Sequence, residues 1–129
     1  MAAEAVKVLV FSCGHLRMGA YAGDVSAVID AEAARGRGIE LVPLSALIGM
    51  DRHSEARETN VLILKNSIRG ILIGPLEEMA EVAPDEVLPL PRSITRCEGL
   101  APYIGGIVRD DGVILVVDMR KIASIKETA

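Results

Sequence analysis

Residues 103–118, YIGGIVRDDGVILVVD, decide the fold class of this chain. Two runs rich in β-branched residues, IGGIVR and VILVVD, are joined across Asp110-Asp111-Gly112. An Asp-Gly pair between such runs is typical of a β-hairpin, because the tight turn needs residues that tolerate positive φ. The second run is apolar without strict alternation, as expected for a strand covered on both faces or inside a small barrel. The stretch predicts a buried hairpin without reactive groups.

Short strands separated by turn signals also run through the rest of the chain. They are predicted at residues 5–12, 16–22, 39–42, 59–64, 68–73, 79–82 and 87–90. Asn66 lies near the tip of a second hairpin, between the fourth and fifth of these strands. Residues 44–50 and 119–122 indicate single helical turns, and residues 51–58 a polar loop. Many short strands without a long amphipathic helix are typical of small barrels or a sandwich.

Residues 24–35, DVSAVIDAEAAR, are the ambiguous stretch. Asp24 suits a helix N-cap, and the alanines that follow favour helix. Gly36 suits the C-terminal stop of a helix. The pattern alone therefore predicts a short helix or helical turn here.

Composition limits the classes of function. The chain has 129 residues, enough for one domain or two very small barrels that share a core. With no Trp, one Phe and two Tyr, the core must be aliphatic, and there is little to stack on the bases of single-stranded nucleic acid. The net charge of −4 opposes binding to phosphate backbones or anionic membranes. We therefore expect neither nucleic acid nor membrane insertion.

The location is predicted to be cytoplasmic. The N-terminal residues lack a basic region followed by a long apolar run, so no signal peptide is indicated. No apolar stretch approaches the length that spans a bilayer. Cys13 and Cys97 are too few and too far apart for a CxxC motif, and both are expected to be reduced.

Three groups of residues resemble reactive sites but lack the rest of the pattern. His15 and His53, the latter near Asp51, have no second ligand at a zinc-site spacing, so we predict no metal. Cys13 close to His15 suggests a thiol–base pair, but no third orienting group is visible. Ser45 and Ser93 lack the G-x-S-x-G context of a hydrolase. No catalytic residue is predicted.

Two further stretches could be interpreted as functional sites, but each also has a purely structural interpretation. The RGRG of residues 35–38 lacks the Gly-Lys-Ser/Thr of a phosphate-binding loop and is interpreted as a connector. An acidic run could in principle provide acid–base chemistry if burial separated its pKa values, but a solvated face is preferred. Its members are Glu77, Glu78, Glu81, Asp85 and Glu86.

The second half of the chain resembles the CheW family, the adaptor proteins of bacterial chemotaxis arrays. The resemblance rests on TNVLILKNSIRGILIGPLEEMAEVAPDEVLPLP followed by YIGGIVRDDGVILVVDMRKI. Family members show a GLLVD-like segment, a stretch ending in plP, and a closing LLD. Pro75 stands where the family usually has the Asp of GLLVD, and Asp118 matches the Asp of the closing motif.

The first half shows the same resemblance with one departure. RGRGIELVPLSALIG matches the family's "RGrvlPvvdLr.llG", so Arg35 and Gly36 fall on its RG. VLVFSCGHLRMGAYAGDVSAVI matches the preceding block up to the "V.ev" element. Only residues 29–34 separate the two blocks, where the family has a full loop and a strand. The first barrel is therefore predicted to be shortened by about one strand.

The resemblance implies an all-β fold of two small SH3-like β-barrels without a catalytic centre or cofactor. We expect a single domain over residues 1–129, two intertwined barrel subdomains, and a second subdomain over roughly residues 57–118. In the family, such adaptors couple methyl-accepting chemoreceptors to the regulatory domain of the histidine kinase CheA. The receptor-groove positions carry over to Val25, Ala27 and Arg35, with Ala27 in place of the usual Glu.

A barrel that lacks a strand leaves unpaired backbone groups along an edge. We therefore hypothesise that the chain forms a homodimer or accepts a partner's strand. One alternative function is a truncated regulator that binds a different signalling partner or self-associates. Another, from a different class, is a small-molecule-binding β-barrel or an enzyme that uses the acidic run.

Overall fold

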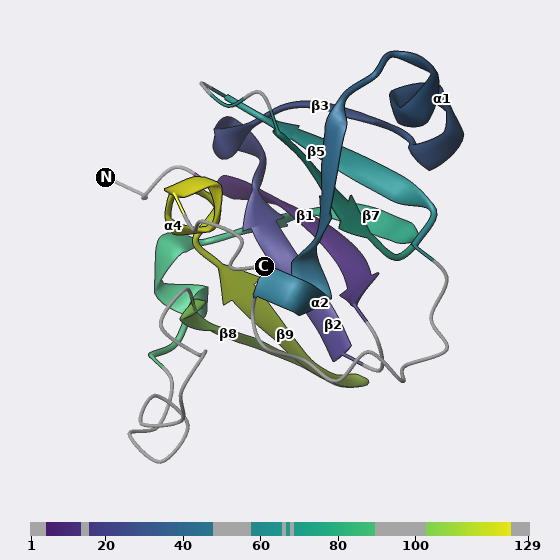
Figure 1. Cartoon of the computed structure of the whole chain (residues 1–129). Helices are drawn as coiled ribbons and strands as arrows, with labels where there is room; N and C mark the ends of the chain where they lie inside the picture. The colour runs from purple at the N-terminus through teal and green to yellow at the C-terminus, as the bar shows by residue number, and fades with distance from the viewer. Residues whose placement is uncertain are drawn as a thin grey trace.

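The computed structural model describes residues 5–13, 16–47, 58–65, 67, 69–89 and 103–124 (Figure 1). Short strands dominate it, and every helix is brief. The strands are β1 (Val6–Cys13), β2 (Leu16–Tyr21), β3 (Val25–Asp30), β4 (Glu40–Pro43), β5 (Asn60–Leu64), β6 (Arg69–Ile73), β7 (Leu76–Val82), β8 (Tyr103–Arg109) and β9 (Gly112–Val117). The helices are the 3-10 turns η1 (Ala22–Asp24) and η2 (Pro84–Glu86) and the α-helices α1 (Ala31–Gly36), α2 (Leu44–Leu47) and α4 (Met119–Ser124).

The strands form two sheets. The five-stranded sheet has the order β7-β1-β2-β9-β8, and the four-stranded sheet has the order β3-β5-β6-β4. The β2–β9 and β4–β6 pairs are parallel, and the other pairs are antiparallel. The predicted all-β fold is confirmed. Of the described strands, four form the sheet built from residues 25–73 and five form the other sheet.

The sheets do not follow a boundary near residue 57. Strands β5 and β6 belong to the four-stranded sheet, whereas β1 and β2 join β7, β8 and β9 in the five-stranded sheet. The five-stranded sheet therefore combines both ends of the chain, and the middle of the chain forms the other sheet. The chain changes sheets at η1, which connects β2 of the five-stranded sheet directly to β3 of the four-stranded sheet.

Both predicted hairpins are present. In the β8–β9 hairpin, Val108 pairs with Val113 and Arg109 with Gly112, whose φ of 136° suits glycine. Strands β5 and β6 form the second antiparallel hairpin. Asn66, placed near its tip, lies outside the described residues.

The helix predicted over residues 24–35 is wrong in its first half. Residues 25–30 are strand β3, paired with β5 from Val25–Leu64 to Asp30–Asn60, and only residues 31–36 form a helix. Val25, Val28 and Ile29 are β-branched and suit a strand, whereas the alanines begin at Ala31. Pairing with a distant strand thus decided a segment whose local pattern was ambiguous.

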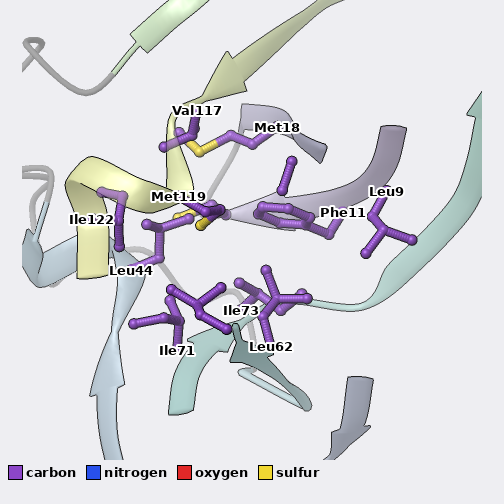
Figure 2. Packing of buried hydrophobic residues seen from close by; sticks show 13 residues of the cluster. Leu9, Phe11, Met18, Leu44, Leu62, Ile71, Ile73, Val117, Met119 and Ile122 are labelled. Atoms are coloured by element: carbon purple, nitrogen blue, oxygen red, sulfur yellow. The ribbon is translucent and has the colours of Figure 1, made fainter. Parts of the chain in front are cut away.

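The main core lies between the two sheets (Figure 2). Phe11, fully buried, is surrounded by aliphatic and methionine side chains from both sheets, α2 and α4. The buried members are Leu9, Phe11, Cys13, Met18, Ala20, Leu44, Leu62, Leu64, Ile71, Ile73, Val117, Met119 and Ile122. The aliphatic core expected from the scarcity of aromatic residues is thus what the structure contains.

A second core lies on the opposite face of the five-stranded sheet. Because side chains alternate along a strand, Leu9 and Phe11 face the main core, whereas Val8 and Val10 face the second one. Its other buried members are Ala80, Val82, Ile107, Ile114 and Val116.

An isolated bridge brings the two ends of the five-stranded sheet together. After β7, the chain passes through η2 to Leu88, which exchanges two backbone hydrogen bonds of 2.8 Å with Gly106 in β8. A Cβ atom at the neighbouring Gly105 would collide with the Leu88 carbonyl oxygen. The curled sheet therefore depends on glycine at this position.

Substitution Gly105→Ala should destabilise the protein by about 1–3 kcal/mol, because the Leu88 segment must move away from β8. Chemical denaturation monitored by circular dichroism measures this loss. Gly36→Ala is the matched control, since a Cβ atom there meets nothing within 4 Å and alanine favours helix. Equal stability of the two variants would contradict the role given to Gly105.

The Cys13 thiol is buried in the main core. Burial raises its pKa from 9.0 to about 11, and the carboxylate of Glu58 acts in the same direction. Burial likewise raises the pKa of the Tyr103 hydroxyl from 10.0 to about 12. Both groups are therefore held in their neutral forms in the folded protein.

The raised pKa of Cys13 should make the protein less stable at alkaline pH. The unfolded chain releases this proton near pH 9 and the folded chain near pH 11, so the contribution of the thiol is complete below pH 9 and is lost as pH rises to about 11. A shift of this size corresponds to about 2–3 kcal/mol. Denaturation curves at several pH values measure it, and Cys13→Ala should flatten the dependence. An unchanged pH dependence in that variant would contradict the assignment.

Candidate partner-binding site

Strand β3 carries two of the three predicted receptor-groove residues. Val25 is half-buried and packs against the main core, whereas the Ala27 side chain is exposed. A bulge lies between them, because Val25 pairs with Leu64 and Ala27 with Ile63. The Ser26 hydroxyl, at the bulge, donates a 3.1 Å hydrogen bond to the Ile63 carbonyl oxygen. The bulge thus turns Val25 toward the core within two residues of an exposed alanine.

Arg35 lies at the other end of β3. It is exposed in the last turn of α1, which begins where the Ala31 N–H donates to the Thr59 carbonyl oxygen. Its positive charge acts on Glu58, whose pKa burial raises and Arg35 lowers. Since strands rise about 3.3 Å per residue, the six residues of β3 separate Val25 from this end by roughly 16 Å. The structure therefore brings Val25 and Ala27 together but not Arg35.

The RGRG stretch ends α1. Arg35 and Gly36 are its last residues, and Gly38 has a φ of 70°, a left-handed conformation that favours glycine. The Gly38 and Ile39 amides donate to carbonyl oxygens of α1. This stretch is therefore a helix C-terminus that leads into β4, as a connector would be.

A hollow of about 300 Å³ lies at the Val25 end of β3. Its lining comes from three segments distant in sequence: η1, the end of β5, and α4. Leu64 and Met119 are buried apolar members, and Lys65 and Arg120 are exposed cations. The remaining lining residues are Gly23, Asp24 and Ala123. This combination offers an apolar floor and a charged rim at the seam between the two sheets.

Two aspartates hold the walls of the hollow. Asp24 accepts a 3.2 Å hydrogen bond from the Arg120 Nε atom, which ties η1 to α4. Asp118 caps α4, because its Oδ1 atom accepts from the amides of Arg120 at 3.0 Å and Lys121 at 3.4 Å. The Asp that matches the closing family motif thus fixes the start of the helix that lines the hollow.

Sequence reasoning did not find this hollow. Its lining residues form no recognisable motif in the sequence. Gly23, Leu64 and Met119 are far apart along the chain, and no sequence pattern indicates that they are neighbours. Only Val25, which directly follows Asp24, pointed to this region.

The acidic run forms part of the scaffold at two positions. Glu77 accepts hydrogen bonds from the Ser12 hydroxyl at 3.0 Å and the Arg17 Nε atom at 3.1 Å, and Arg17 also contacts Asp111 at 2.8 Å. Glu86 accepts from the Ala83 amide at 2.9 Å. All five carboxylates of the run are exposed, in line with the preferred solvated face.

Several other sequence candidates cannot be compared with the structure. His15, His53, Asp51, Ser93 and Cys97 lie outside the described residues. Within the described part of the chain, no three His, Cys, Asp or Glu side chains are grouped so that they could hold a metal ion. None of the helices described there is long and apolar enough to cross a membrane.

The chain was compared with known proteins. The sequence model of the CheW-like domain matches residues 26–127, more than three quarters of the chain. No curated protein matches.

Among solved structures, the scaffolding protein TtCheW from Thermoanaerobacter tengcongensis has the same fold, with a TM-score of 0.73 and 19% sequence identity. The alignment covers 96% of this chain and 97% of that one. CheW-like proteins are non-enzymatic scaffolds of bacterial chemotaxis, which confirms the prediction that the chain is not an enzyme. With a family match over most of its length, the chain belongs to the CheW-like domain family.

Proposed function

We propose that this protein is a cytoplasmic adaptor that couples chemoreceptors to the regulatory domain of a CheA-type histidine kinase. The family match over residues 26–127 carries this proposal. The chain, residues 1–129, acts as a single CheW-like domain with two intertwined subdomains. It needs no cofactor, because its role is to hold two partners through protein–protein contacts.

The Val25 end of β3 is the receptor contact. Here the hollow has room for one or two apolar side chains over Leu64 and Met119, and its cationic rim lies within reach of acidic groups on the partner. Val25 and Ala27 extend this surface along β3. Ala27 cannot supply the carboxylate that the family usually has at this position, so burial of apolar side chains must provide more of the affinity.

An exposed apolar pair on the five-stranded sheet is a candidate for the kinase contact. Val108 and Val113 are directly opposite each other near the β8–β9 turn, and their exposed fractions are 66% and 50%. Adjacent exposed aliphatic side chains favour a protein interface. The pair comes from a different sheet than β3, so receptor and kinase could be held at the same time.

Calorimetric titration tests the adaptor function. The full chain should bind both the kinase regulatory domain and a receptor-tip fragment from the same organism, and each partner should still bind when the other is saturating. Binding to neither partner would overturn the proposal.

The two ends of β3 can be distinguished by substitution. Gly23→Gln adds a long side chain at a residue that lines the hollow, and a Cβ atom there meets nothing within 4 Å. It should weaken receptor binding by about 1–3 kcal/mol, whereas Gly23→Ala, which is too short to fill the hollow, should not. Isothermal titration of each variant measures the change.

Arg35→Ala tests the other end, with Arg37→Ala as a matched control from the same exposed helix terminus. Loss of receptor binding in Arg35→Ala alone would mean that the contact reaches along the whole of β3. No effect of either Gly23→Gln or Arg35→Ala would place the receptor contact elsewhere.

A further inference from the structure

The four-stranded sheet has two open edges. Strands β3 and β4 are its outer strands, and no segment that the structure describes pairs with the free side of either one. Figure 1 shows β3 along the margin of the molecule, with α1 continuing from one of its ends. In the five-stranded sheet, by contrast, Leu88 covers part of β8.

The two open edges differ in how well they are protected. Strand β4 has four residues, ends at Pro43, which has no N–H to donate, and begins with Glu40. Strand β3 has six residues with neither proline nor lysine, and its single charge is Asp30 at the end. Proline, charge and short length are the features by which edge strands avoid pairing. Strand β3 lacks them over most of its length.

The backbone groups on the free side of β3 can be identified. Ala31 donates its N–H to the Thr59 carbonyl oxygen, and the Ser26 hydroxyl reaches the Ile63 carbonyl oxygen. Because residues of an antiparallel ladder point alternately toward and away from the partner, Ala27 and Ile29 bond to β5. The N–H and C=O groups of Val28 and the N–H group of Asp30 therefore point outward, whereas the Asp30 carbonyl oxygen accepts the first hydrogen bond of α1, of which Asp30 is the N-cap.

The adjacent sheet face is incompletely covered. Among the described residues, the buried members of this face are Ala31 and Ala34 of α1 and Val61 of β5. Five aliphatic side chains around them are half-buried: Ile29, Ile39, Leu41, Ile63 and Leu72. A strand paired beside β3 would lie next to Ile29 and would bury more of that side chain.

Charge favours a second copy in antiparallel orientation. In a parallel pair, the Asp30 side chains of two copies would approach each other, which is unfavourable. In an antiparallel pair, Asp30 approaches the partner's Val25 end, where the neighbouring Asp24 is paired with Arg120 and Lys65 is exposed at the end of β5. A two-fold axis at the middle of β3 makes this arrangement self-complementary.

We propose that two copies of this chain pair through β3, antiparallel and about a two-fold axis, so that their four-stranded sheets become one continuous sheet. The outward groups of Val28 and Asp30 supply the hydrogen bonds of the new ladder. Val25 and Ala27 also belong to the proposed receptor contact, so a second copy and the receptor compete for β3. The pairing itself does not depend on the adaptor function, and the chain alone is sufficient to test it.

Sedimentation velocity over a wide concentration range should show a monomer–dimer equilibrium. Ala27→Lys introduces a charge in the middle of the edge and should weaken dimerisation by about tenfold or more. Ala5→Lys, an equally exposed alanine just before β1, is the matched control and should leave the equilibrium unchanged.

Asp30→Pro tests the backbone directly. Asp30 has a φ of −68°, which proline adopts without strain, and its N–H points away from β5, so the fold of the monomer should be retained. Dimerisation should again weaken by about tenfold, whereas Asp30→Ala, which keeps the N–H, should weaken it less. Thermal unfolding verifies that each variant is folded.

Hydrogen exchange gives an independent measurement. The Val28 and Asp30 amides should exchange more slowly as the concentration of the chain rises. A chain that remains monomeric at every concentration, a dimer insensitive to both Ala27→Lys and Asp30→Pro, or exchange at Val28 that does not depend on concentration would overturn the proposal.

Discussion

Strand β1 is buried on both faces, and the two principal cores of the molecule meet across it. Val8 and Val10 point into the core of the five-stranded sheet, whereas Leu9 and Phe11 point into the core between the sheets. Of its two neighbours, β2 follows it directly in the sequence, whereas β7 lies more than 60 residues further along the chain. A one-residue shift in the register of β1 would exchange these two sets of side chains and disrupt both cores. The relative position of the two sheets thus depends on this strand.

The candidate receptor contact follows from that arrangement. The chain leaves β2 through η1, enters β3 in the other sheet, and returns at its end to α4, which packs back on the main core through Met119 and Ile122. The hollow forms where these crossings meet, between η1, the end of β5 and α4. A partner that binds there touches the end of β5 and the two segments, η1 and α4, that connect to the five-stranded sheet through β2 and β9.

The segment between β3 and β4 is the short helix α1, which covers apolar residues on one face of the four-stranded sheet. Alanines of α1 lie against Val61, and their small side chains let a six-residue helix pack closely on the sheet. The cover is partial, since Ile29, Ile39 and Leu41 remain half-buried, and the edge of β3 stays open. The short connection between β3 and β4 therefore leaves an open strand edge beside an incompletely buried face.

Local signals in the sequence were sufficient for the hairpins. The Asp-Gly turn before Val113 and the aliphatic runs of β5 and β6 act between neighbouring residues, so both hairpins could be predicted, as could the aliphatic core. Local signals failed over residues 24–35, where helix and strand propensities are balanced and pairing with β5 decided the outcome. Sequence placed Val25 and Ala27 in one short element of the candidate site but predicted a helix there, whereas the structure has strand β3.

The sequence by itself determined the fold class, the family and the neighbouring placement of Val25 and Ala27, because these depend on periodicity, turn residues and motif order along the chain. The tertiary structure alone decided that Arg35 lies at the far end of β3, that Gly23, Leu64 and Met119 share a hollow, and that β3 is an open edge. These features depend on pairing between strands far apart in sequence, which no local pattern encodes.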